Sequence, residues 1–279
     1  MSASRSFVPV LGYRKGSLGL PDGTRIPYLT LDDSSMLVIY VPGAGDGLTT
    51  VTDAALRLAF YFRKRLSSYR MLLLTRRQPN TQGFTVGQHA HDCLWAIEHL
   101  GWGPSLVESN SAGRPIRQWV ATKRPELVRV LILSCSLHRT SEHTRELLEY
   151  WIELARNERW YELYRSGIEH TYRPQTVARY RPSFPQLLRL LSHPRHLKRM
   201  EHAFESPSNL DNCPILPWIS RSALVIGGED DRVVPADGQQ EMAALIPESQ
   251  LNLYPGYGHG NDQENSDYDR QVDLFVSEL

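Results

Sequence analysis

Two serines separated by one residue lie near the middle of the chain, in the stretch S-N-S-A-G from Ser109 to Gly113. A serine hydroxyl acts as a nucleophile when a tight strand-to-helix turn presents it and a neighbouring base accepts its proton. Such a turn needs small residues two positions before and after the nucleophile, because bulky ones would strike the adjacent strand and helix. Ser111 has Ser109 and Gly113 there, whereas Ser109 would follow the β-branched Val107. The spacing favours Ser111 over Ser109 as the nucleophile. A polar turn at a helix N-cap stays an alternative for Ser111 on this motif alone.

A base and an acid for this serine can be found near the C-terminus. His259 lies between two glycines, after the last apolar run and before the closing helical stretch. Asp231 follows the apolar run S-A-L-V-I-G-G, with Asp230 beside it as a competing carboxylate. In acyl transfer a histidine takes the serine proton, and a carboxylate holds the histidine in the required tautomer. The three side chains therefore predict nucleophilic catalysis by Ser111, His259 and Asp231.

The order serine, aspartate, histidine, each after a separate apolar run, resembles the α/β-hydrolase superfamily. The family's acid motif, G-x-x-D-x-x-V-P, matches residues 228–235 and selects Asp231 over Asp230. Its histidine motif, G-x-G-H, matches residues 256–259, and the resemblance covers about residues 15–279. It implies a serine hydrolase with Ser111 on a nucleophile elbow, and no metal or other cofactor.

The resemblance also implies an oxyanion hole made of backbone N–H groups. One donor would be Ala112, directly after the nucleophile. The other would be Ala44, in the glycine-rich loop that follows the apolar run Met36–Val41. The family commonly begins this loop with His-Gly, and Pro42 replaces the histidine here. The donor is a backbone group, so function can survive this change, and the sequence leaves open how the loop is anchored.

Four further residues are predicted to contact the substrate. Gly43 and Gly45 allow the loop backbone to approach a ligand closely. Asn110 precedes the nucleophile, and Trp151 lies in a region rich in aromatic residues. A small-molecule acyl compound is the expected partner.

The leading functional prediction is a carboxylesterase that cleaves small to medium carboxylic esters through an acyl-enzyme. A second reading is a carbon–carbon bond hydrolase of ring-cleavage diketones, because Asn110-Ser111 is similar to that subfamily's G-N-S-M-G-G elbow. Ala112, Ser109 and Arg114 depart from that elbow. A cofactor-free haloperoxidase or an acyltransferase would use the same triad. A third reading, from another class, is a ligand-binding protein of this fold with little turnover.

The elements that must position these residues alternate along the chain. Near-continuous apolar runs of this length are typical of strands buried on both faces of a parallel sheet. Residues 16–31 differ, since the turn signal Pro21-Asp22-Gly23 predicts an antiparallel hairpin. The strands are predicted at Met36–Val41, Arg70–Thr75, Ser105–Ser109, Val128–Ser134, Ser222–Gly228 and Gln250–Gly256, with helices at Asp53–Leu66, Val86–Leu100, Arg114–Arg124 and Asp237–Ile246. This order predicts an α/β fold, with a mostly parallel sheet flanked by helices.

The alternation stops between residues 139 and 217, where aromatic residues recur at helical spacing among many arginines. We interpret this segment as a helical cap inserted into a core domain made of residues 1–138 and 218–279. Its aromatic residues would pack it onto the core, and some would line a pocket. Its arginines would form a solvated face with the local glutamates, or bind an acidic substrate.

Composition excludes several classes of protein. The 279 residues carry a formal net charge of zero, which argues against nucleic-acid binding. Cys93, Cys135 and Cys213 are widely spaced, so neither a disulfide framework nor a zinc motif is predicted. His89, His91 and Asp92 would point in different directions on a helix, so they do not predict a metal site.

The N-terminus lacks the apolar core of a signal peptide, and no run of about 18 apolar residues occurs. These features predict a soluble cytoplasmic protein without a membrane partner. The sequence leaves open the physiological substrate, the role of Arg114, the role of the arginines in 139–217, and the oligomeric state.

Overall fold

The computed structural model describes residues 12–32, 34–43, 49–78, 85–111, 114–186, 197–205 and 208–279. Its centre is an eight-stranded sheet with the order β1-β2-β4-β3-β5-β6-β7-β8. The strands are β1 (Tyr13–Gly19), β2 (Arg25–Leu31), β3 (Met36–Val41), β4 (Tyr69–Leu74), β5 (Ser105–Asn110), β6 (Val128–Ser134), β7 (Ala223–Gly228) and β8 (Ser249–Tyr254). β1 and β2 form the expected antiparallel hairpin, β2 pairs antiparallel with β4, and all other pairs are parallel. The prediction of a mostly parallel α/β sheet is confirmed.

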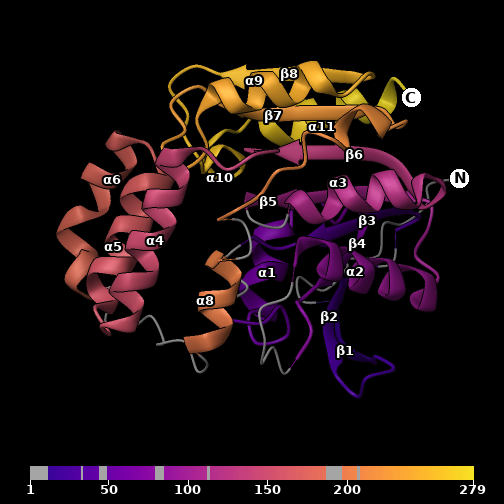
Figure 1. Cartoon of the computed structure of the whole chain (residues 1–279), viewed down its shortest axis with the longest axis horizontal. Helices are drawn as coiled ribbons and strands as arrows, with labels where there is room; N and C mark the ends of the chain where they lie inside the picture. Colours follow the sequence, from indigo (N-terminus) through magenta and orange to yellow (C-terminus); the bar gives the residue numbers. More distant parts are fainter. Residues whose placement is uncertain are drawn as a thin grey trace, which may run out of the picture.

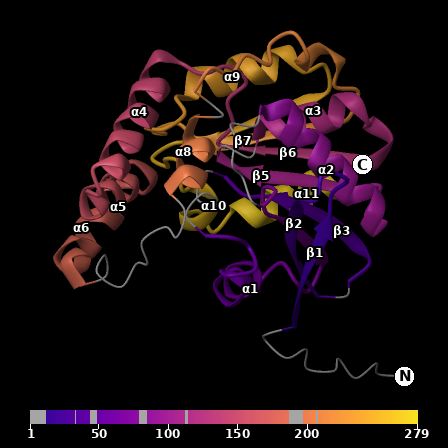
Figure 2. The same cartoon turned by 60° about the horizontal axis from the view of Figure 1, so that its bottom comes forward.

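Helices cover both faces of this sheet, because successive strand residues point to opposite sides. In β3, Ile39 packs with α2 (Val86–Leu100), α3 (Arg114–Lys123) and α9 (Ala236–Leu245). Its neighbour Val38 packs on the other side with α1 (Ala55–Phe62) and α11 (Tyr268–Ser277). Figures 1 and 2 show these two helical layers on either side of the strands.

The helix ends follow from local sequence. Thr85 caps α2 in a capping box with Gln88, and Gly101 ends the helix in the left-handed conformation. The helix predicted at Asp53–Leu66 is shorter at both ends, with α1 spanning Ala55–Phe62. Turns flank it, and no side-chain cap stabilises its N-terminus.

The described residues between 139 and 217 form a separate layer of helices beyond the carboxyl ends of the strands (Figure 1). Within the described ranges this segment contains no strand. Its helices are α4 (Glu142–Arg156), α5 (Trp160–Thr171), α6 (Pro174–Tyr180) and α8 (Leu197–Glu205). Apolar side chains of α4 and α8 pack against each other and on Val233 and Val234 of the loop after β7. We call residues 139–217 the helical region; its treatment as a cap domain with these boundaries stays a prediction.

The described part of the chain contains no helix that combines the length and the apolar character needed to cross a membrane.

Candidate catalytic site

Ser111 occupies a sharp turn between the end of β5 and the start of α3. Its φ is +53°, in the left-handed region that residues with a Cβ seldom adopt. Such backbone strain costs about 1–3 kcal/mol and is concentrated at functional sites, where it presents a side chain that a relaxed turn would not. The backbone of Ser111 is strained as expected of the nucleophile on such an elbow.

Asp231 and His259 form a direct pair in the interior. His259 Nδ1 lies 2.9 Å from Asp231 Oδ2 and 3.1 Å from Oδ1. Asp231 Oδ1 also accepts hydrogen bonds from the backbone N–H groups of Val233 and Val234, each at 2.8 Å. An ionised carboxylate can only accept hydrogen bonds, so the shared proton belongs on Nδ1. Nε2 is then left as the proton acceptor.

The loops that carry this pair follow the neighbouring strands β7 and β8. Asp230 donates its backbone N–H to the Tyr257 carbonyl at 2.9 Å, and Glu229 donates to Tyr254 at 3.0 Å. The approach is so close that a Cβ at Gly228 would lie 2.0 Å from the Tyr257 carbonyl oxygen. Glycine at position 228 therefore allows the acid loop and the histidine loop to pack together.

The histidine loop is held from two further sides. The thiol of Cys135, directly after β6, donates to the His259 carbonyl at 3.3 Å. The Gly260 backbone N–H donates to the carbonyl of Thr171, the last residue of α5, at 2.7 Å. The helical region thus contacts the loop that carries His259.

Ser111 and His259 line the same cavity, which has a volume of about 510 Å³. Both the sheet layer and the helical region contribute to its wall. The described lining residues are Tyr40, Pro42, Gly43, Thr49, Thr50, Val51, Ala54, Arg57, Leu58, Ser111, Trp151, Leu163, Tyr164, Gly167, Ile168, Thr171, Tyr172, Phe204, Val233, His259 and Gln263. A mostly apolar wall with a few polar groups is typical of a small-molecule site.

Two predicted substrate contacts, Gly43 and Trp151, line this cavity. Trp151 Nε1 donates to Ser166 Oγ at 2.9 Å, which leaves the indole face as its contribution to the wall. Asn110 ends β5, but its side chain lies outside the described residues, as do Gly45 and both predicted oxyanion donors, Ala44 and Ala112.

The anchor of the glycine-rich loop is a residue that sequence reasoning missed. Arg76 is buried after β4, and its Nη1 donates to the Gly43 carbonyl at 3.1 Å. Pro42 replaces the family's usual histidine, and a guanidinium from the neighbouring strand end holds Gly43, at the start of this loop. The only signal in the sequence was the pair Arg76-Arg77 directly after an apolar run.

Comparison with known proteins agrees with this architecture. The sequence profile of the family described as "alpha/beta hydrolase fold" matches residues 74–261, about two thirds of the chain. The chain belongs to this family.

Individual relatives of this α/β-hydrolase are distant. A 2-hydroxy-6-oxononadienedioate/2-hydroxy-6-oxononatrienedioate hydrolase of a Pseudomonas species is 24% identical over 220 residues, covering 75% of this chain and 77% of that protein. An alpha/beta hydrolase enzyme from a Medee basin deep-sea metagenome library superposes with a TM-score of 0.81 at 19% identity, covering 95% and 98% of the two chains. A thermophilic esterase from Thermogutta terrifontis superposes with a TM-score of 0.76 at 19% identity, covering 95% and 98%. At such identity the solved structures support the fold alone.

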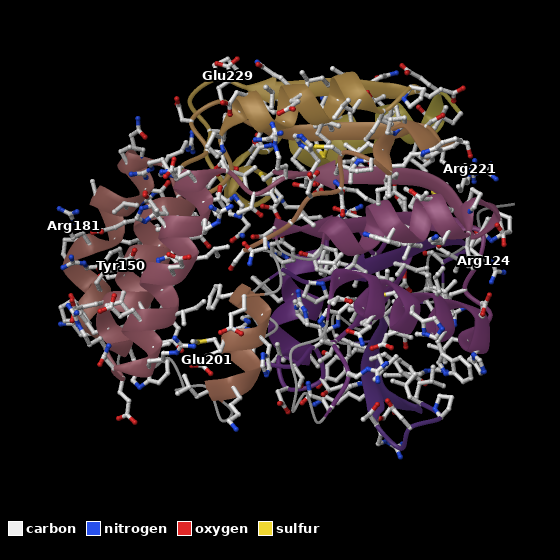
Figure 3. All side chains as sticks on the ribbon, in the orientation of Figure 1. Arg124, Tyr150, Arg181, Glu201, Arg221 and Glu229 are labelled. Carbon is white, nitrogen blue, oxygen red and sulfur yellow. The ribbon has the colours of Figure 1, made fainter. Side chains whose placement is uncertain are left out.

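Arginines of the helical region mostly pair with glutamates. Arg156 contacts Glu201 at 2.7 Å, and Arg181 contacts Glu169 at 3.1 Å. Arg181 points away from the sheet at the outer edge of the hydrolase (Figure 3). Among the described residues that line the cavity, the one with a permanent charge is Arg57, which comes from α1.

Two groups of side chains in the described part have donor atoms close enough for a metal ion, and neither includes His89 or His91. One group is Cys135, Asp231 and His259. In this group the Asp231 carboxylate and the His259 imidazole already contact each other, and the Cys135 thiol donates to the His259 carbonyl. These side chains are therefore engaged in the Asp231–His259 arrangement described above.

Proposed function

We propose that this protein is a serine hydrolase that cleaves carboxylic esters, with Ser111 as nucleophile, His259 as base and Asp231 as the acid that orients the base. The buried His259–Asp231 pair carries this proposal, because His259 lines the same apolar cavity as Ser111, whose φ is positive. In the proposed reaction Nε2 of His259 accepts the Ser111 proton while the serine Oγ attacks the ester carbonyl.

The remaining steps follow acyl-transfer chemistry. The backbone N–H groups of Ala44 and Ala112 are the proposed donors to the oxyanion. His259 returns its proton to the departing alkoxide, which leaves an ester of Ser111. Water, deprotonated by His259, then attacks this ester, and the acid is released with Ser111 reprotonated.

The cavity suggests a substrate with an apolar body and a negatively charged end. Its volume of about 510 Å³ fits a small to medium molecule, and its wall is mostly apolar. Arg57 adds a permanent positive charge, and the described part of the chain offers it no carboxylate partner. A guanidinium left without a carboxylate is suited to bind one on a ligand.

Carbon–carbon hydrolysis of a ring-cleavage diketone is the second candidate, and the Pseudomonas relative named above favours it. Its name describes a substrate with two carboxylates, which Arg57 would also suit. The reaction would use the same nucleophile and base on a ketone carbonyl. The leaving group would then be a carbon, which must be protonated for the bond to break.

Covalent labelling tests the proposed nucleophile. A fluorophosphonate should label the wild-type chain once, at Ser111, and Ser111→Ala should abolish both labelling and ester turnover. Ser109→Ala is the matched control, because alanine is also small enough for the elbow, and it should retain activity. Folded protein that is not labelled would refute the serine-hydrolase proposal. Turnover of p-nitrophenyl esters compared with a vinylogous diketone separates the two candidates.

Kinetics of paired esters test the charged end. Arg57→Gln should raise KM about two- to fivefold for a hemisuccinate ester and leave KM for a neutral ester of equal length unchanged, because an exposed ion pair contributes at most about 1 kcal/mol. Arg63→Gln is the matched control, since Arg63 follows the same helix but does not line the cavity. Equal effects of Arg57→Gln on both esters would refute this assignment.

A further inference from the structure

A second cluster of side chains lies where the helical region leaves and rejoins the sheet layer. His138 follows β6, Cys213 precedes β7, and Glu241 belongs to α9. A donor atom of each lies within 4.8 Å of the donor atoms of the other two. Thiolate, imidazole and carboxylate are the ligands from which proteins build zinc sites.

His138 is the most telling member of this cluster. Its side chain is 1% exposed, and within the described part of the chain neither ring nitrogen has a hydrogen-bond partner. Nε2 lies 3.4 Å from Glu241 Oε2, without hydrogen-bond geometry. A buried polar group without a partner is costly, so this arrangement calls for a ligand on the ring.

Cys213 lies in surroundings that favour a cation. Asp211 Oδ1 accepts the Cys213 backbone N–H at 3.0 Å, so its carboxylate stays beside the cysteine. The negative charge of this carboxylate attracts a divalent ion.

The backbone around the cluster is well anchored. The buried Asn212 donates from Nδ2 to Gln118 Oε1 at 2.6 Å and accepts from Trp119 Nε1 at 3.2 Å. Its backbone N–H donates to the His138 carbonyl at 2.8 Å. These contacts hold two ligand-bearing segments together before any ion arrives, and such support orients metal ligands.

We propose that His138, Cys213 and Glu241 bind one zinc ion, with water or Asp211 as the fourth ligand. Binding forms bonds from zinc to the thiolate, the imidazole and the carboxylate, and it releases the thiol proton to solvent. Tetrahedral zinc at ordinary bond lengths places its ligands about 3.5 Å apart. His138 Nε2 and Glu241 Oε2 are already 3.4 Å apart, and the Cys213 sulfur lies within 4.8 Å of a donor atom of each. The half-exposed Glu241 side chain can rotate to follow the ion.

The ion would clamp the two chain segments that connect the helical region to the sheet. Arg139 competes with it, because its Nη2 contacts Glu241 at 3.0 and 3.1 Å. Both partners are about half exposed, so this ion pair is weak and can be displaced.

Cobalt(II) titration of the metal-free full chain tests the proposal, since a cobalt–thiolate bond gives a charge-transfer absorption band. The wild type should bind one Co²⁺ per chain with this band, and Zn²⁺ should displace it. Cys213→Ser should abolish the band, Glu241→Gln should weaken Co²⁺ binding at least tenfold, and Arg139→Gln should strengthen it. A purely structural ion pair between Arg139 and Glu241 would not produce these opposite effects.

Cys135→Ala is the control for binding at the other cluster, and it should keep the band. Alkylation followed by mass spectrometry gives a readout that needs no variant: Zn²⁺ should slow modification of Cys213 and leave Cys93 unchanged. A band that is absent from the wild type, or lost in Cys135→Ala and kept in Cys213→Ser, overturns the proposal. Zinc that leaves Cys213 alkylation unchanged also overturns it.

Discussion

Replacing Asp231 with asparagine isolates the contribution of the acid from that of the fold. The amide oxygen can keep the two hydrogen bonds from the Val233 and Val234 backbone that Asp231 Oδ1 accepts at 2.8 Å. The amide NH2 then takes the place of Oδ2, which lies 2.9 Å from His259 Nδ1. Since an amide nitrogen can only donate, His259 must move its proton to Nε2 and can no longer accept the Ser111 proton.

The size of the effect follows from this tautomer change. Loss of the correct tautomer in such a triad lowers kcat by about ten-thousand-fold, which corresponds to about 5.5 kcal/mol of transition-state stabilisation. Stability should change much less, because the side chain keeps its volume and its backbone partners. The loss of transition-state stabilisation should therefore exceed the loss in free energy of unfolding by several kcal/mol.

The assay compares kcat on a p-nitrophenyl ester with the free energy of unfolding in urea for Asp231→Asn and Asp230→Asn. Asp230 is exposed and adjacent, so the same substitution there should leave kcat within about twofold, as for surface changes away from a site. A fall of less than tenfold in Asp231→Asn, with Ser111→Ala fully inactive, would refute the assignment of the acid. A large fall in Asp230→Asn would reverse the choice between the two carboxylates.

Three further predictions concern packing and charge. Gly228→Ala should lower kcat more than stability, because its Cβ would push on the backbone of the histidine loop; Gly238→Ala, which meets nothing within 4 Å, is the control in both assays. Glu108→Leu should lower the free energy of unfolding in urea by about 3–5 kcal/mol, because the buried Arg65 then loses the carboxylate that lies 2.7 Å away. Adding Arg65→Met should restore most of this free energy. Burial and nearby arginines lower the pKa of His89 to about 3, so below about pH 6.5 the unfolded chain binds a proton that the folded chain does not. Stability should therefore fall by about 2 kcal/mol between pH 7 and pH 5, and His89→Leu should flatten this slope in urea unfolding at the two pH values.

The strands could be read from the sequence because they are buried on both faces. Val128–Ser134 was predicted to the residue, and β7 begins one residue later than predicted, at Ala223. The early hairpin was equally clear, because Pro21-Asp22-Gly23 separates its strands. The length of α1 was harder to predict, because Ala54 and Leu66 in the flanking turns continue the helical spacing of its apolar residues.

The candidate site likewise contains residues that the sequence predicted and residues that it did not. Asp231 and His259 follow the ends of strands and carry motifs, so the sequence was sufficient to bring them together. Arg76 and Arg57 carry no motif, and their positions at the glycine-rich loop and the cavity depend on how β4 and α1 pack. Residues that are distant in the chain and meet only in the fold have no fixed spacing in the sequence, so no motif identifies them. The cluster of His138, Cys213 and Glu241 could not be predicted for the same reason.

The strand order explains why the site forms at this edge of the sheet. β5, β6, β7 and β8 are adjacent and parallel, so the residues that follow them all emerge at the same end. Ser111 follows β5, Cys135 follows β6, and the loops after β7 and β8 carry Asp231 and His259, the proposed acid and base. The helical region also departs from this end, after β6, and its Thr171 carbonyl holds the histidine loop through Gly260. Any movement of the helical region that broke this hydrogen bond would act on the base as well as on the cavity wall, so substrate entry and the position of His259 are expected to be coupled.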